Sequence, residues 1–159
     1  MIEFRDINWE NYEEVIDLQV NEHEKKFVAS NLESLADAFV DWTITGVRPM
    51  AYAIYHDDKL VGFIMMSYCQ ENKDRQSNED KRYFLWRFMM DKAHQGKGYG
   101  RAAMVKMVEH LRTRPQGPAG WCYTSYEPGN DVASGLYAKF GFEETGEIDG
   151  GEIVMRMKL

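Results

Sequence analysis

The chain has 159 residues, of which 44% are hydrophobic and 28% are charged. These proportions exclude a disordered chain and predict a single folded domain over residues 1–159. The net charge of −7 disfavours nucleic acid as the main partner, because phosphate binding needs a basic face. The first residues lack a basic start before an apolar core, and the longest apolar stretch, residues 60–66, is too short to cross a membrane. We therefore expect neither a signal peptide nor a membrane partner.

The reactive side chains predict neither a disulfide framework nor a metal site. Cys69 and Cys122 are too few for a disulfide scaffold, so a reducing, cytoplasmic setting is the simplest interpretation. The histidines, together with Asp91, do not make a set of metal ligands.

The first half of the chain begins with a short predicted strand, residues 2–5, and Asn8 is placed to cap a first helix. Ser30 and Glu33 form a capping-box pattern before a second helix, which we expect to end by Pro49. This second helix carries a continuous apolar stripe made of Leu32, Leu35, Ala36, Phe39 and Val40.

Three predicted strands come next. Residues 50–55 and 59–68 make a hairpin around the polar turn at Asp57 and Asp58. Residues 70–81 are strongly polar and predict a solvated loop. Residues 82–91 are mostly apolar and fit a buried central strand.

A glycine-rich segment, residues 95–101, leads into the third helix, and residues 121–126 form the next strand. Residues 132–139 form a short helix that ends at Gly141. One face of the third helix holds Met104, Val105, Val108 and Leu111. Strands at 142–147 and 152–158 close the chain as a hairpin. The order predicts a mixed α/β domain around one sheet.

The glycine-rich segment has the features of a pyrophosphate site. Gly96, Gly98 and Gly100 leave the backbone bare between a strand and a helix. The first amides of a helix have no partner within it and carry partial positive charge, so they bind anions. Lys97 and Arg101 would add charge from the side.

Three other interpretations of this segment compete. A nucleotide-binding P-loop needs Ser or Thr after Gly-Lys, whereas Gly98 follows Lys97. A dinucleotide fingerprint needs a longer spacing before its third glycine. A tight strand-to-helix turn without any ligand stays open on the glycines alone.

Two separated motifs give the chain a family resemblance. Gln95, Gly98 and Gly100 match the Gln/Arg-x-x-Gly-x-Gly/Ala signature of the GNAT superfamily of N-acetyltransferases. A second block supports the match with Asn130, Ala133, Leu136, Tyr137, Phe140, Gly141 and Phe142. The element order is similar to that family over essentially the whole chain. Residues 87–91 and the closing hairpin resemble the bacterial spermine/spermidine (diamine) acetyltransferases more narrowly.

The resemblance implies an α/β (α+β) fold of the GNAT type and acetyl-CoA as co-substrate. Its central sheet would be mixed, mostly antiparallel, of about seven strands, splayed between the fourth and fifth and flanked by about four helices. Many members of the superfamily are dimers, so a homodimer is expected.

The resemblance also implies roles for individual residues. The backbone of Phe88, Met89 and Met90 would pair with the pantetheine arm, and Asn130 would contact that arm from the opposite side. Tyr137 would lie near the thioester sulfur as the general acid. The CoA pyrophosphate would be held by the amides of Gln95, Gly96, Lys97, Gly98, Tyr99, Gly100 and Arg101.

The acceptor side is less defined. Related polyamine acetyltransferases often carry a carboxylate base at the place that Trp86 occupies here. Trp86 would instead wall the acceptor pocket or stack on an ammonium group, and Glu127 is the first substitute for the base. Other carboxylates that could line the acceptor channel are Glu22, Glu24 and Glu33. A water chain without a dedicated base is the alternative.

These features predict an enzyme that acetylates a small cationic amine such as spermidine or spermine, by direct attack in a ternary complex. A second hypothesis keeps the fold and co-substrate but changes the amine to an aminoglycoside, a small antimicrobial amine or a protein N-terminus. A third is a non-catalytic domain that binds acetyl-CoA as a sensor. Tyr137 argues against the sensor, and Trp86 argues for it.

Overall fold

The computed structural model describes residues 1–70 and 81–159, and most of the loop expected over residues 70–81 lies outside this range. One seven-stranded sheet runs in the order β1-β2-β3-β4-β5-β7-β6. The strands are β1 (Ile2–Asp6), β2 (Met50–His56), β3 (Lys59–Gln70), β4 (Lys81–Met90), β5 (Trp121–Tyr126), β6 (Glu143–Asp149) and β7 (Glu152–Lys158). The helices are α1 (Tyr12–Asp17), α2 (Asn31–Thr45), α3 (Tyr99–Arg112) and α4 (Asp131–Lys139), with the 3-10 turn η1 (Glu22–Glu24). Among the described residues, only β4 and β5 pair in parallel, which confirms the expected mixed, mostly antiparallel sheet.

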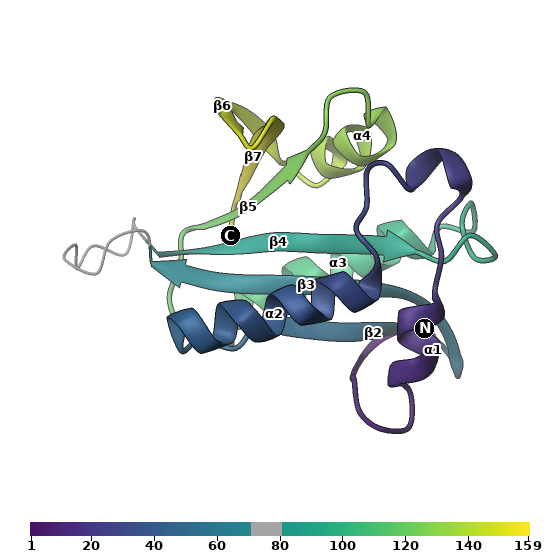
Figure 1. Ribbon diagram of the computed structural model, residues 1–159. Coiled ribbons are helices and arrows are strands. Elements are labelled where there is room, and N and C mark those ends of the chain that lie inside the picture. Colours follow the sequence, from purple (N-terminus) through teal and green to yellow (C-terminus); the bar gives the residue numbers. More distant parts are fainter. Residues whose placement is uncertain (71–80) are drawn as a thin grey trace.

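Helices lie on both faces of the sheet (Figure 1), and each face carries an apolar layer. Because successive strand residues point to opposite faces, Ile54 and Ile64 join the layer under α3, whereas Ala53 and Phe63 join the layer under α1 and α2. The α3 contribution to its layer is Ala103, Met104, Met107, Val108 and Leu111, while Val105, which we expected on the same face, is 44% exposed.

The N-terminal helices differ from the prediction at their ends. α1 begins at Tyr12 after Asn11 rather than at Asn8, because the Asn8 side chain forms a turn and accepts a hydrogen bond from the Glu10 amide at 2.8 Å. The capping box at the start of α2 is confirmed. α2 ends at Gly46, before Pro49, because glycine adopts its left-handed conformation (φ +74°) without steric cost.

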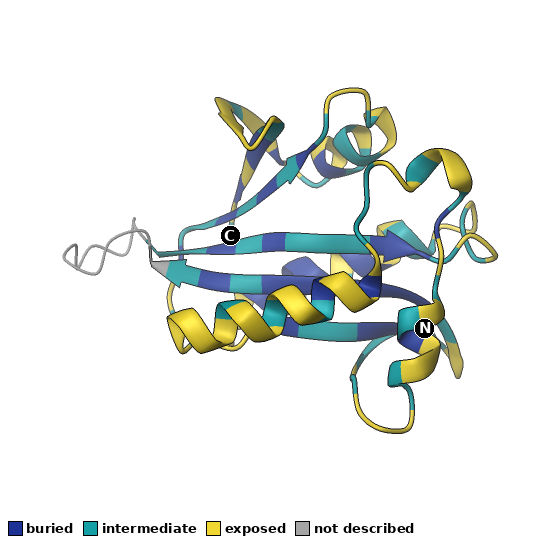
Figure 2. Ribbon diagram, viewed as in Figure 1, coloured by how far each residue is buried: buried dark blue, intermediate teal, exposed yellow. Residues whose placement is uncertain are grey.

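The apolar stripe of α2 faces outward, contrary to the usual orientation of such a stripe. Leu35 packs against the sheet, but Leu32, Phe39 and Val40 are 61%, 62% and 53% exposed (Figure 2). The buried side of α2 is instead small and polar. Ser34 is fully buried there, and Asn31 donates a hydrogen bond to the Val15 carbonyl oxygen at 2.8 Å.

β4 and β5 separate halfway along their length, which confirms the expected splay. Their parallel pairing runs only from Arg82 opposite Trp121 to Leu85 opposite Thr124. β4 continues to Met90 while paired with β3 on its other side. β5 turns away toward α4 and stays paired with β7 (Figure 1). The segment 86–90 of β4 therefore has one backbone edge without a strand partner among the described residues.

Candidate active site

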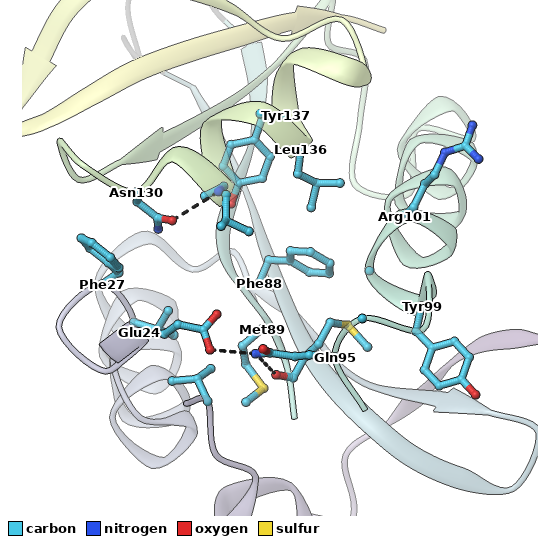
Figure 3. Close-up of a pocket in the computed structure, with 18 of the residues that line it drawn as sticks. Glu24, Phe27, Phe88, Met89, Gln95, Tyr99, Arg101, Asn130, Leu136 and Tyr137 are labelled. Atoms are coloured by element: carbon cyan, nitrogen blue, oxygen red, sulfur yellow. Dashed lines mark hydrogen bonds between the residues drawn. The ribbon is translucent and has the colours of Figure 1, made fainter. Parts of the chain in front are cut away.

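Two cavities meet where the sheet splays. The first cavity, of about 520 Å³, lies between the end of β4, the glycine-rich loop and α4 (Figure 3). The second cavity, of about 460 Å³, lies between β4, β5, the start of β7 and the segment that follows η1. Both are lined by Phe27, Val28, Phe88, Asn130, Ala133 and Tyr137. Two molecules, one bound in each cavity, would thus come close to each other at these shared residues.

The glycine-rich loop opens its backbone toward the first cavity. Gly96 and Gly98 have φ values of +73° and +80°, and the space where a Cβ atom would stand is open at both. α3 starts at Tyr99 without a side-chain cap. Its first intrahelical bond runs from the Ala102 amide to the Gly98 oxygen at 3.1 Å, so earlier amides of the turn have no acceptor within the helix. The loop has the geometry of a pyrophosphate cradle.

The basic residues of this loop take different positions. Arg101 lines the first cavity. Lys97 does not, because its ammonium group donates a hydrogen bond to the Ala93 carbonyl oxygen at 2.8 Å. The predicted contribution of Lys97 to anion binding therefore rests on its backbone amide.

Gln95 fixes the loop to the rest of the site. Its Nε2 donates to the Met90 carbonyl oxygen at 3.1 Å and to Glu24 Oε2 at 3.0 Å (Figure 3), and its Oε1 accepts from Asn21 at 2.7 Å. Glu24, which the sequence suggested for the acceptor channel, thus lines the first cavity. Burial raises the pKa of Glu24, but hydrogen bonds from Gln95 and Asn21 outweigh it and lower the pKa overall. Glu24 stays ionised and holds the loop in place.

The unpaired edge of β4 forms a wall of the first cavity. Phe88, Met89 and Met90 line it, and the last two side chains are buried. An extended chain placed along this edge could hydrogen-bond to the backbone as an added strand would. Asn130 stands across the cavity at the start of α4, where its Oδ1 accepts from the Ala133 amide at 3.2 Å.

Tyr137 stands at the junction of the two cavities. It comes from α4, is 7% exposed, and packs against Phe142 with ring centroids 5.7 Å apart. Burial raises the pKa of Tyr137 to about 12, and a hydrogen bond with Thr124 opposes that rise in part. The phenol is therefore protonated at neutral pH and can donate a hydrogen bond or a proton.

The second cavity brings together part of the predicted acceptor site. Glu33, Trp86 and Glu127 line it. Trp86 forms a wall, as one of the two expectations had it, and the cation over its ring is the chain's own Arg87 at 5.6 Å. Glu22 lines neither cavity, since it is 84% exposed and paired with Lys25.

Ser125 and Glu152 also line the second cavity, although no sequence motif indicated either residue. The Ser125 hydroxyl donates a hydrogen bond to Glu152 Oε2 across β5 and β7. The register places Ser125 opposite Val154, and Glu152, two residues before Val154, points to the same face of the sheet. Only this register could have revealed the pair.

Two absences concern only the described parts of the chain. Within residues 1–70 and 81–159, no cluster of three or more His, Cys, Asp or Glu side chains could hold a metal ion. In the same ranges, none of the helices has the length and apolar character that a membrane span requires.

Comparison with known proteins places this architecture. A spermine/spermidine N(1)-acetyltransferase from Bacillus subtilis (strain 168) is 30% identical over 159 residues, covering 99% of both chains. An aminoglycoside acetyltransferase solved with coenzyme A superposes with a TM-score of 0.75 at 18% identity, over 99% of this chain and 95% of that one. An N-acetyltransferase from Thermoplasma acidophilum, solved with coenzyme A, gives a TM-score of 0.67 at 18% identity over 100% and 99%. The sequence pattern of the acetyltransferase (GNAT) family matches residues 3–142. The chain belongs to the acetyltransferase (GNAT) family.

Proposed function

We propose that this N-acetyltransferase moves the acetyl group of acetyl-CoA to a primary amine of a small polyamine such as spermidine or spermine, by direct attack in a ternary complex. The observation that carries the proposal is the meeting of two cavities at Tyr137. One cavity has the glycine-rich loop and an unpaired strand edge, and the other is lined by both carboxylates and cationic side chains. A donor and an acceptor bound in them would bring their reacting atoms together, which by itself accelerates the transfer.

The residues of the first cavity fit acetyl-CoA. The amides from Gln95 to Arg101 would hold its pyrophosphate, with Gly96 and Gly98 leaving room for the close approach. The backbone of β4 from Phe88 to Met90 and the side chain of Asn130 would hold the pantetheine arm from opposite sides. Acetyl-CoA supplies the activated acetyl group.

The chemistry requires a neutral amine, because a protonated amine has no lone pair. As the amine attacks, the carbonyl oxygen gains negative charge, which a backbone amide near Met89 would stabilise. Tyr137 would protonate the departing sulfur. Since the pKa of Tyr137 is about 12 and that of an ordinary thiol is about 8.5, full transfer is uphill unless the phenol recovers a proton. The phenol would recover that proton either from water or from a second proton-carrying group in the second cavity, and on the sequence alone Glu127 is that group.

Two features support a polyamine as the acceptor. The Bacillus subtilis relative carries a spermine/spermidine acetyltransferase name, and Glu127 and Glu152 put negative charge on the β5 and β7 side of the second cavity. Lys25, Lys26 and Arg87 line the same cavity, so its charge is mixed. That mixture keeps other amines, namely aminoglycosides, small antimicrobial amines and protein N-termini, as the second hypothesis.

The proposal is tested by measuring release of the CoA thiol from acetyl-CoA with a panel of amines. We expect turnover with spermidine and spermine and at least tenfold lower kcat/KM with aminoglycosides and peptides. A reversed preference would replace the acceptor while keeping the enzyme. Thermal stabilisation by acetyl-CoA without thiol release on any amine would instead support the sensor hypothesis.

We further propose that the chain forms a homodimer through the outward stripe of α2, made of Leu32, Ala36, Phe39, Val40 and Thr43. Leu32, Ala36, Phe39 and Thr43 follow one another at spacings of four, three and four residues, with which two helices interlock, and a twofold axis would pair the stripe with itself. With Trp42 and Ile44, 46% and 76% exposed, α2 exposes on the order of 500 Å² of apolar surface. An apolar area of this size matches the largest exposed patch of a typical monomer, which is often functional, and it is smaller than one side of a standard interface.

Charge also favours an antiparallel α2 pair. Glu33 and Asp37 lie in the N-terminal half of α2, where Asp37 also pairs with Arg87 at 3.4 Å, whereas Asp41 lies in the C-terminal half and Arg48 follows the C-terminal end. A second copy running the opposite way would bring the Arg48 guanidinium toward the partner's acidic half and would align the helix dipoles favourably. A nonidentical apolar partner would have no such built-in match.

The dimer is tested by light scattering after gel filtration. We expect a dimeric mass for the wild-type chain and a monomeric mass for Phe39→Glu, because a buried unpaired carboxylate is costly. Ile148→Glu is the matched control, since Ile148 is 73% exposed on β6 and should leave the dimer intact. A monomeric wild-type chain, or a dimer that survives Phe39→Glu, would contradict the proposal.

A further inference from the structure

Three carboxylates line the second cavity, and their surroundings differ. Glu33 is held by the start of α2: its Oε2 accepts from the Ser30 amide at 3.0 Å and from the Ser30 hydroxyl at 2.7 Å. The hydrogen bonds with the Ser30 side chain and backbone lower the pKa of Glu33. A carboxylate that is fixed as a helix cap and stabilised in its charged form is a poor proton acceptor.

Glu127 follows the end of β5. Its backbone oxygen accepts from the Asn130 amide at 3.0 Å, which closes the turn into α4. No hydrogen bond orients its side chain among the described residues. Efficient proton transfer requires a side chain held within reach of the reacting atom, and the structure provides no such restraint for Glu127.

Glu152 is restrained by a side-chain hydrogen bond at the wall of the second cavity. It is the first residue of β7, half-buried, and its Oε2 accepts a hydrogen bond from the Ser125 hydroxyl of β5. No cation pairs with it in the described parts of the chain. It also lies within electrostatic range of the catalytic phenol. Burial is the main cause of the raised pKa of Tyr137. The charge of Glu152 raises this pKa further, whereas neither Glu33 nor Glu127 is among its causes.

We propose that Glu152, positioned by Ser125, binds the acceptor's amino group and takes the proton that its nitrogen loses as the C–N bond forms. The inference rests on the proposed acetyl transfer to an amine, and it replaces Glu127 as the base. It assigns a binding and catalytic role to the β5–β7 side of the cavity.

The proton balance places the transfer in the bond-forming step. A carboxylate cannot deprotonate a free ammonium group efficiently, because ordinary pKa values for the two groups are about 4.3 and 10.4. The amine therefore reacts from its neutral form. Its nitrogen becomes strongly acidic as it bonds to the carbonyl carbon, and one N–H proton passes to Glu152. The C–S bond breaks, the sulfur takes a proton from Tyr137, and the phenol recovers one from Glu152 through solvent in the cavity. The products are the amide and the free thiol, and both side chains return to their starting forms.

Substitution of the two rival carboxylates separates them. With the best amine of the panel, we expect Glu152→Gln to lower kcat by about a hundredfold and to weaken amine binding to the CoA complex at least tenfold in calorimetry. Acetyl-CoA affinity should change by less than about threefold. Glu127→Gln should lower kcat by at most about fivefold. Glu147→Gln, on exposed β6, is the matched control for removal of a surface charge and should match the wild type.

Further variants keep the test decisive. Glu152→Asp retains the carboxylate and should restore part of the activity that Glu152→Gln loses, whereas a merely structural role would make both variants similar. Ser125→Ala should lower kcat by about three- to tenfold, because the carboxylate stays but is released. If the wild-type enzyme turns over and Glu127→Gln carries the large loss, the assignment of Glu152 is wrong while the proposed function stands. If no amine turns over, the proposed function fails. In that case the affinity of the CoA complex for the amine tests the binding role of Glu152. Equal amine affinity in the wild-type chain and in Glu152→Gln would overturn that role.

Discussion

Tyr137→Phe is expected to lower kcat by about 10²- to 10³-fold, while the dissociation constant for acetyl-CoA changes by less than about threefold. The substitution removes only the hydroxyl. The ring keeps its packing against Phe142 and its place at the junction of the two cavities. The loss should be similar at pH 7 and pH 9, because burial raises the pKa of Tyr137 to about 12 and the phenol is protonated at both values. Steady-state kinetics at the two pH values and calorimetry with acetyl-CoA measure the effect.

A matched tyrosine controls for the loss of a hydroxyl group in general. Tyr123, on the neighbouring strand β5, lines neither cavity. Tyr123→Phe should therefore retain wild-type kcat. Unchanged turnover in Tyr137→Phe would show that the departing sulfur takes its proton from solvent, and it would remove the acid role from Tyr137.

Gly98→Val is expected to weaken acetyl-CoA binding by roughly a hundredfold, which corresponds to about 2.7 kcal/mol. Gly98 precedes the first turn of α3 and has open space above it on the side where a pyrophosphate would approach. A branched side chain there would stand between the phosphate and the amides that bind it. Calorimetry and the rise in melting temperature with acetyl-CoA both report the loss.

Backbone strain must be separated from the steric effect on the ligand. Gly98 has a φ of +80°, where a branched residue is strained even without any ligand. Gly146 has a nearly identical φ of +85°, open space around its Cβ position, and no part in either cavity. Gly146→Val should lower the melting temperature by a similar amount but leave acetyl-CoA affinity intact. Gly98→Val with wild-type affinity would mean that the pyrophosphate lies elsewhere.

Local sequence signals predicted the helices and strands and the glycine-rich loop that lines the first cavity. The capping box at Ser30 and Glu33 and the glycines before α3 act through neighbours a few residues away, so their effect can be inferred from the sequence. The nearly continuous apolar runs of β2 and β3 likewise predict strands that are buried on both faces. The boundaries of α1 and α2 were less predictable, because more than one nearby residue could end each helix. Asn11 rather than Asn8 precedes α1, and Gly46 rather than Pro49 ends α2.

The orientation of α2 and the lining of the second cavity depended on contacts between segments that are distant in the sequence. Periodicity showed that α2 has an apolar stripe, but most of the stripe points away from the sheet. The side of α2 that is buried carries Ser34 and Asn31 instead. The pairing of Ser125 with Glu152 joins residues 27 positions apart, and no local pattern encodes the register that aligns β5 with β7.

The sequence by itself determined the family, the order of elements and the position of the glycine-rich loop, because each depends on short motifs or on periodicity within one element. The tertiary structure decided that Ser125 hydrogen-bonds to Glu152, that Gln95 hydrogen-bonds to Glu24, and which side of α2 is left open. Those features depend on how β4 and β5 diverge and on the packing of helices against the sheet. Such packing depends on the shapes of side chains that are distant in the sequence and become neighbours only in the folded chain.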